Sequence, residues 1–290
     1  MAKVSYPHYA WAVGHALVLV GTVYTLLGLV TFSGRSKSYY LAYAGAIVSW
    51  GIVVYKSLGA PQPNRAYIQR ALLDENVQYL LLALYWFMQK PIYVTLVPFA
   101  TFSLFHTLTF LRTTVLPKVP SSPPSQSSSS SAASSAASSS QSPASAGARL
   151  SKLIQTTVLT GCSITVQTWV KAHYEQAMLF VAFVEVVVVS GRILLGAITF
   201  QNSLLSPLIF GHFLRLRYYL SPPTRQAFSW VSGQLDHYVV KNPNCPAVVK
   251  KVVVGGKELI VRYSESIIQV QQPGGAPAAG AAAAAQQRAR

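Results

Sequence analysis

Residues 11–32 read WAVGHALVLVGTVYTLLGLVTF, a run of 22 residues without a formal charge. At about 1.5 Å of rise per residue, a helix of this length crosses a hydrocarbon core of about 30 Å. Trp11 at the start of the run is typical of the aromatic belt at a membrane surface. The run is longer than the roughly 7–15 apolar residues of a cleavable signal peptide, and no small-residue cleavage site follows it. The sequence therefore predicts a retained membrane-spanning helix.

The composition of the 290-residue chain agrees with a membrane protein. Only 10% of its residues are charged, against about 25% in an average soluble domain, and its mean hydropathy is +0.36. The net charge is nevertheless +16. An apolar chain with a basic excess predicts two partners, the bilayer core and an anionic surface such as lipid headgroups or an acidic protein. Charge alone would also suit nucleic acid, which we do not expect as a partner.

A second apolar segment, residues 39–55, follows the first after only six residues, which predicts an antiparallel helical hairpin. The first segment carries Gly14, Gly21 and Gly28, one glycine every seven residues. Small residues on one helix face allow a neighbouring helix to approach closely. We therefore predict that these glycines pack against another helix, although glycine is also common in membrane helices generally.

Residues 77–111 are apolar apart from a polar break at 89–91. One helix over this range would be about 52 Å long, too long for an ordinary crossing. We predict two membrane-embedded helices that meet at the break, and a re-entrant or kinked hairpin is the alternative. Asp74 and Glu75 precede the range, where acidic side chains favour a helix N-terminus or are ordinary loop charges.

A serine-rich stretch divides the chain. From Ser121 to Ser145, 15 of 25 residues are serine and none is charged, so this stretch cannot bury enough apolar surface to fold. We predict an all-α protein with membrane-embedded helical hairpins and a basic, helical C-terminal domain. Its parts are a transmembrane helical domain at 1–118, a disordered linker at 119–148, a membrane-associated domain with amphipathic helices at 149–270, and a disordered Ala-rich tail at 271–290.

Residues 177–200 are long enough to span a membrane, but they include Glu185 and Arg192. A charge near the bilayer centre costs at least about 2.5 kcal/mol on insertion scales. We therefore predict a buried helix partly sunk in the membrane, and a further span is the alternative. The seven-residue spacing predicts that both charges share one helix face and point into a bundle. The valine run at 186–189 is also compatible with a strand.

The last predicted helix, residues 247–270, places apolar residues on one stripe and charged residues opposite. Such a helix either packs on its own domain or lies in the headgroup plane of a membrane. Residues 201–270 hold eight basic and three acidic residues, which favours a cytosolic location for this half. The residues that we predict to bind membrane or partners are Arg215, Arg217, Arg225, Lys250, Lys251, Lys257, Arg262, Ile260, Tyr263 and Ile267.

The sequence contains no recognised motif for catalysis, nucleotide binding or metal binding, and we predict neither enzymatic activity nor a cofactor. The six histidines form no i,i+4 pair, and Cys162 and Cys245 form no CxxC motif. Two functions that need no reaction centre remain open. One is a small transporter or channel that uses Glu185 and Arg192, and the other is an adaptor that only recruits proteins.

Four stretches carry a family resemblance: DENVQYLLLALYWF at 74–87, PFATFSLFHTLTFLR at 98–112, QNSLLSPLIFGHFLRLRYYLSPPTRQAF at 201–228, and NPNCPAVVKK at 242–251. They resemble the transmembrane protein 33 family, also called the Krüppel homologue 2 class, which includes fungal pore-membrane proteins of the nuclear envelope. The similarity covers most of residues 1–118 and 150–265. The stretch at 201–228 is the most specific, because its run LRLRYYLSPPTRQAF has no general structural reason to exist.

The resemblance implies a protein of the endoplasmic reticulum membrane and nuclear envelope without a known enzymatic activity. Members of this family are implicated in organising the tubular reticulum with reticulon-type partners, and the fungal members in the assembly or distribution of nuclear pore complexes. Their C-terminal region is described as binding membrane and importin. We therefore expect a non-enzymatic membrane organiser whose partners are anionic lipid, reticulon-type proteins, and nucleoporins or importins.

Overall fold

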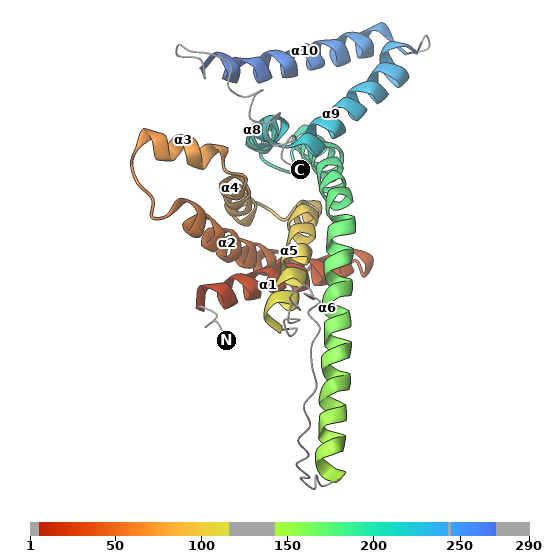
Figure 1. Ribbon diagram of the computed structural model, residues 1–290. Helices are drawn as coiled ribbons and strands as arrows, with labels where there is room; N and C mark the ends of the chain where they lie inside the picture. Colours follow the sequence, from red (N-terminus) through yellow and green to blue (C-terminus); the bar gives the residue numbers. More distant parts are fainter. Residues whose placement is uncertain (1–5, 116–142, 243–244, 271–290) are drawn as a thin grey trace, which may run out of the picture. The chain divides into compact units, whose positions relative to one another are not determined.

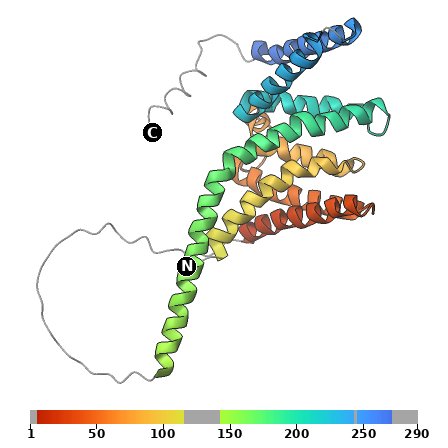
Figure 2. The same cartoon turned by 90° about the vertical axis from the view of Figure 1, so that its right-hand side faces the viewer.

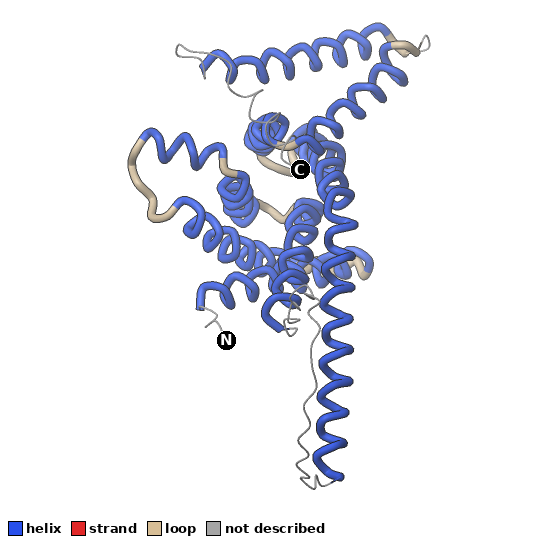
Figure 3. Tube along the Cα trace, in the orientation of Figure 1, coloured by secondary structure: helices blue, strands red, loops and turns tan. Residues whose placement is uncertain are grey.

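The computed structural model describes residues 6–115, 143–242 and 245–270, which form helices joined by short turns, with no strand among them (Figure 3). The all-α prediction is therefore confirmed. The helices are α1 (Tyr6–Val30), α2 (Ser36–Leu58), α3 (Arg65–Leu73), α4 (Glu75–Met88), η1 (Tyr93–Thr95), α5 (Leu96–Phe110), η2 (Leu111–Val115), α6 (Pro143–Phe183), η3 (Val184–Val189), α7 (Ser190–Ile198), α8 (Leu205–Leu220), α9 (Pro222–Leu235), η4 (Asp236–Val240) and α10 (Ala247–Val270).

The chain divides into two compact units, Met1–Ala227 and Phe228–Arg290. The first unit contains α1 to α8 and the start of α9, and the second contains the rest of α9, η4 and α10 (Figure 1). The predicted boundary within 119–148 stays a prediction, because residues 119–142 lie outside the described ranges, as does the predicted tail at 271–290. Helix α6 begins at Pro143, inside the range predicted as linker.

Four helical segments are long and apolar enough to cross a membrane: Tyr6–Val30, Ser36–Leu58, Tyr93–Thr114 and Ser163–Ile198. The first covers the span predicted at 11–32 except its last two residues, and the second contains the span predicted at 39–55. The fourth contains most of residues 177–200. A further membrane span there, which was the alternative to a buried helix, is thus possible by length and composition. The protein is therefore a multi-pass membrane protein.

Helix α2 lies at the centre of the membrane-spanning helices and packs along α1 as the predicted hairpin, as well as against α4 and α5. Tyr39, Tyr43 and Trp50 of α2 are buried. The hydroxyl of Tyr43 lies 2.7 Å from Oγ1 of Thr95, at the start of α5. Because the bilayer supplies no hydrogen-bonding partner, such buried hydroxyl pairs help fix how the helices pack.

Residues 77–111 form two helices separated by a break, as predicted. Helix α4 ends at Met88, and η1 and α5 begin at Tyr93 and Leu96. The side chain of Asp74 caps α4, because its Oδ1 accepts hydrogen bonds from the backbone N–H groups of Asn76 at 2.8 Å and Val77 at 3.1 Å. Asp74 is thus the predicted acidic residue at a helix N-terminus.

The valine-rich segment η3 is a π-helix that continues α6 into α7 without interruption. The backbone N–H of Ser190 bonds to the carbonyl of Glu185, five residues earlier. The strand that we considered for residues 186–189 is therefore wrong. In a continuous helix the backbone groups find partners within the segment, which an isolated strand inside the membrane would lack.

The π-helical turn also corrects the expectation that Glu185 and Arg192 share a face. A π-turn inserts about one residue more than α-geometry requires, so side chains beyond it are displaced by about 100° around the helix. Glu185 consequently lies on the same side as Ile193, and both are buried. Arg192 is exposed and donates from Nη2 to Oε1 of Gln201 at 3.3 Å.

Three turns of the first unit lie at one end of its helices, on the right in Figure 2: α1–α2, α4–α5 and α7–α8. The hydroxyl of Tyr40, near the start of α2, donates to the carbonyl of Gln89 at 3.2 Å and so joins two of them. Phe32 and Phe200, in the first and third turns, have positive φ angles of 51° and 57° and are 97% and 83% exposed. We call this end of the unit the turn end.

Candidate functional site

A buried polar cluster joins α4, η3 and α8 in the first unit. The hydroxyl of Tyr79 donates to Oε1 of Glu185 at 2.6 Å. Nη1 of Arg217 lies 2.8 Å from Oε2 of Glu75, and its guanidinium carbon lies 5.3 Å from the centroid of the Tyr79 ring. We call these four residues the charge cluster.

Burial gives the charge cluster its energetic importance. Glu185 is 1% exposed and Arg217 is 4% exposed. Both ionisable side chains are therefore almost completely enclosed by the rest of the protein. Burial by itself lowers the pKa of Arg217. The neighbouring acidic groups of Tyr79, Glu185 and Glu75 outweigh that effect and raise the pKa above its ordinary value, so the guanidinium remains charged.

Hydrogen bonding in the charge cluster is incomplete among the described residues. Oε2 of Glu185 and Nε of Arg217 are buried without a hydrogen-bond partner there, and Nη1 of Arg217 approaches Glu75 as an ion pair rather than with hydrogen-bond geometry. A buried charge is stable only when it is paired. Tyr79, Glu185 and Arg217 therefore depend on one another, whereas the side chain of Glu75 is 51% exposed and pairs with Arg217 at the edge of the cluster.

The sequence-predicted residues Arg215 and Arg217 lie inside the first unit instead of on its surface. Both are buried, and Arg217 belongs to the charge cluster. Arg225 is exposed, and its Nη1 donates to the backbone carbonyls of Tyr218 at 3.4 Å and Tyr219 at 3.0 Å, near the end of α8. Only Arg225 of these three presents its charge at the surface.

The charge cluster also includes residues that the sequence did not single out. Tyr79 was not a candidate, and Glu75 was expected only at a helix N-terminus. One sequence signal connects them, because Glu75 and Tyr79 are four residues apart and so share a face of α4. Their partners on η3 and α8 come from tertiary packing. The structure pairs Glu185 with Tyr79 and not with Arg192.

The three glycines of α1 lie where a side chain would collide with its neighbours. A Cβ on Gly14 would lie 2.7 Å from the carbonyl oxygen of Gly45, and one on Gly21 would lie 2.9 Å from Cβ of Ala42. A Cβ on Gly28 would lie 2.7 Å from the carbonyl oxygen of Ser33. The absence of side chains at Gly14 and Gly21 thus permits the backbones of α1 and α2 to approach closely.

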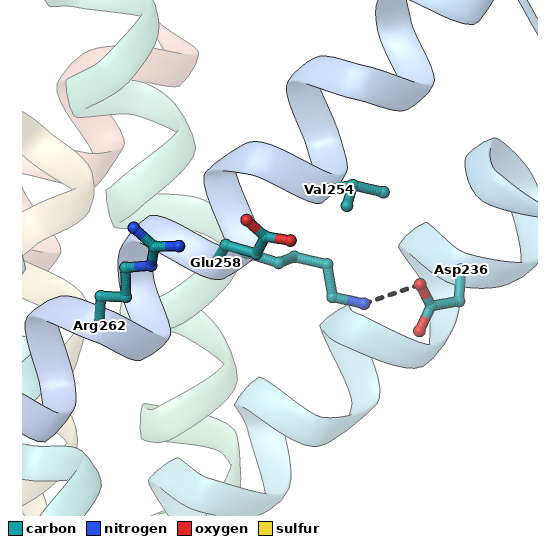
Figure 4. Close-up of a pocket in the computed structure, with 5 residues that line it drawn as sticks. Asp236, Val254, Glu258 and Arg262 are labelled. Atoms are coloured by element: carbon teal, nitrogen blue, oxygen red, sulfur yellow. Dashed lines mark hydrogen bonds and ion pairs between the residues drawn. The ribbon is translucent and has the colours of Figure 1, made fainter.

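A second group of the predicted residues lies in the second unit, on α10. Nζ of Lys257 pairs with Oδ1 of Asp236 at 2.7 Å (Figure 4). These two residues line a cavity of about 380 Å³ together with Val254, Glu258 and Arg262. The charge of Lys257 is therefore paired inside the second unit. Lys251 and Arg262 are exposed, and Lys250 is half-buried.

Apolar side chains on α10 are also exposed. Val252 is 68% exposed and Val248 is 72% exposed, and both lie close in sequence to Lys250 and Lys251. The predicted residues Ile260, Tyr263 and Ile267 continue the same helix, but their side chains lie outside those that the structure describes. The exposed surface of α10 thus carries both apolar and basic side chains.

The described residues contain no group of three or more His, Cys, Asp or Glu side chains arranged to hold a metal ion. His15 and His106 are instead packed together, with ring centroids 4.6 Å apart, and Nδ1 of His15 lies 3.0 Å from Oγ of Ser103. This packing accounts for His106 within its apolar helix.

The sequence of this chain is similar to those of known proteins. The sequence profile described as "Transmembrane protein 33/Nucleoporin POM33" matches residues 1–266. The nucleoporin POM33 of Chaetomium thermophilum is 30% identical over 239 residues, which cover 80% of this chain and 77% of that protein. Tetra-spanning protein 1 of Schizosaccharomyces pombe is 27% identical over 270 residues, covering 91% of this chain and 86% of the relative.

The similarity extends to animal proteins. Human transmembrane protein 33 is 24% identical over 244 residues, which cover 83% of each chain. No solved structure matches the chain with significance. Because the profile covers nearly the whole length, including the membrane spans and the helices after them, the chain belongs to the transmembrane protein 33/nucleoporin POM33 family.

Proposed function

We propose that this protein is a non-enzymatic organiser of the endoplasmic reticulum membrane and nuclear envelope, which acts in shaping tubular reticulum or in assembling and distributing nuclear pores. Its relatives carry the names nucleoporin, pore membrane protein and transmembrane protein 33. In this proposal the spanning helices anchor the chain, and the basic C-terminal region binds the bilayer surface.

The observation that carries the proposal is the composition of the exposed surface of α10. A helix that only packed on its own unit would turn its apolar residues inward, whereas Val248 and Val252 are exposed. Lys251, between them in sequence, is exposed as well. In a helix at the membrane surface, the valines would insert among the acyl chains and the lysines would lie near anionic headgroups, so both would favour binding to the bilayer.

The same basic region is proposed to bind acidic protein surfaces, such as that of an importin, and the membrane helices to associate with reticulon-type proteins. The name nucleoporin on the Chaetomium thermophilum relative supports a partner at the nuclear pore. Electrostatic attraction of this kind mainly accelerates association and weakens with salt.

A fluorescence experiment on the full chain in nanodiscs tests the membrane contact. An environment-sensitive dye is attached at Val252→Cys, with Cys162 and Cys245 replaced by serine. We expect a blue shift in discs that contain phosphatidylserine and a smaller shift in phosphatidylcholine discs. The double variant Lys250→Glu/Lys251→Glu should lower the equilibrium constant for contact of α10 with the anionic bilayer by at least about thirty-fold, because each lost basic residue contributed about 1 kcal/mol and the new carboxylates are repelled.

The matched control is Arg65→Glu/Arg70→Glu, which changes the net charge equally at two exposed residues of α3. This control should retain the blue shift. A dye that stays in water in both kinds of disc would contradict membrane binding by α10. If the basic C-terminal region then still bound an acidic protein in solution, we would conclude that this chain is an adaptor and not a membrane-binding organiser.

A further inference from the structure

A cavity of about 320 Å³ lies at the turn end of the first unit, between the α4–α5 and α7–α8 turns. Gln89 and Lys90 line it from the first turn, and Phe200, Gln201, Asn202 and Ser203 from the second. Two candidate membrane spans meet it, since one begins at Tyr93 and another ends at Ile198. In a bilayer crossed by these two spans, the cavity would lie near the headgroups.

The lining of this cavity suits an anion. Lys90 contributes a positive charge, and among the residues that the structure describes no acidic side chain lines the cavity. The side-chain amides of Gln89 and Gln201 and the hydroxyl of Ser203 supply further hydrogen-bonding capacity. Lysine binds phosphate as a point charge, and amide and hydroxyl groups donate to its oxygens.

The polar lining is held in place by contacts from the surrounding helices. The side-chain amide of Asn202 donates from Nδ2 to the carbonyl of Ile193 at 3.1 Å. Oε1 of Gln201 accepts from Arg192 at 3.3 Å, which brings a second cation close to the lining. The lining is thus pre-arranged, which reduces the entropy lost when a ligand binds.

Apolar side chains also line the cavity or follow it closely in sequence. Ile92 and Phe200 line it, Phe200 is 83% exposed, and Ile198 and Leu204, near Phe200 in sequence, are exposed as well. A free phosphate ion gains nothing from such side chains. A phospholipid can place its phosphate in the cavity and its acyl chains along these residues, so the combination favours a lipid.

We propose that this cavity is a phospholipid-binding site, in which Lys90 and the polar side chains of the two turns hold the phosphate while Phe200 and Leu204 contact the acyl chains. The site belongs to the first unit and does not depend on membrane binding by α10. It would attach an individual lipid to the spanning helices.

The test uses the full-length protein in detergent micelles and native mass spectrometry, with dioleoyl phosphatidic acid as the probe. We expect one bound lipid per chain. Dioleoylglycerol, which has the same acyl chains without phosphate, should bind much more weakly. Inorganic phosphate should not displace the bound lipid at an equal concentration, because it lacks the apolar contacts.

Lys90→Gln should weaken phosphatidic acid binding by about 10- to 150-fold, since a hydrogen bond to a charged group contributes about 1.5–3 kcal/mol. Lys90→Arg should retain it. The matched control, Lys37→Gln, removes an exposed cation at the turn end that does not line the cavity, and it should bind as the wild type does. Thermal unfolding midpoints of all variants establish that they are folded.

Three results would overturn the proposal. Equal binding of dioleoylglycerol would show that the phosphate is not recognised. Displacement by inorganic phosphate would identify a site for a free anion. Equal affinities of Lys90→Gln and Lys37→Gln would show that Lys90 does not hold the headgroup.

Discussion

Replacing Arg217 by alanine is expected to destabilise the first unit by about 3–5 kcal/mol, because the change leaves Glu185 buried without the neighbouring positive charge of Arg217. Glu185 is 1% exposed and keeps only the hydroxyl of Tyr79 as a hydrogen-bond donor. The loss also removes the link from α8 to Glu75 on α4. The measurement is the free energy of unfolding in mixed micelles, with tryptophan fluorescence as the signal that reports unfolding.

Arg65→Ala is the control for this prediction, because Arg65 is an exposed arginine of α3 and its loss should change stability by less than about 0.5 kcal/mol. A second variant tests the physical cause. Arg217→Met combined with Glu185→Gln removes both buried charges and should recover part of the stability lost in Arg217→Met alone. If Arg217→Ala unfolded at the same midpoint as Arg65→Ala, the charge cluster would not hold the helices together.

Replacing Gly14 by valine should separate α1 from α2 and destabilise the hairpin by about 1–3 kcal/mol or more. The added Cβ would lie 2.7 Å from the carbonyl oxygen of Gly45, and backbone atoms cannot move aside as a flexible side chain can. The same unfolding measurement detects the loss, and cross-linking between cysteines placed on α1 and α2 reports the separation.

Gly51→Val provides the matched control, because Gly51 lies on α2 and a Cβ there would meet no atom within 4 Å. Glycine in a helix interior is unfavourable by roughly 0.5–1 kcal/mol relative to alanine, so filling this position should leave stability unchanged or raise it slightly. Equal destabilisation by the two valine substitutions would mean that close packing at Gly14 is not required.

Much of the membrane portion was predictable from sequence, because a bilayer requires long uncharged helices and the sequence displays them openly. Residues 11–32 and 39–55 had the necessary length, and the break at 89–91 appeared as a polar interruption. Asp74 was recognisable as a helix-capping residue from its position before an apolar run. These features depend on neighbours in the sequence, which is why the pattern alone is sufficient.

The charge cluster was not predictable, because its hydrogen bonds join residues far apart in the chain. Tyr79 and Glu185 are separated by 106 positions, and no local pattern specifies such a pair. The sequence instead suggested that Arg217 was part of a basic surface, since two arginines close together in a helix are usually solvated. The π-turn at η3 was hidden for a similar reason, because its valines are compatible with several backbone geometries.

The two exposed phenylalanines at the turn end have a consequence for how the protein stands in its membrane. Phe32 and Phe200 lie in different turns and are exposed. Each has a cation nearby: Arg35 follows Phe32 in the same turn, and Arg192 of α7 donates to Gln201, the residue after Phe200. Aromatic and cationic side chains anchor helix ends at the bilayer interface. Two separate anchors on one membrane surface fix both the depth of the helices and their tilt, so a local change in bilayer thickness would strain the whole bundle instead of rotating a single helix.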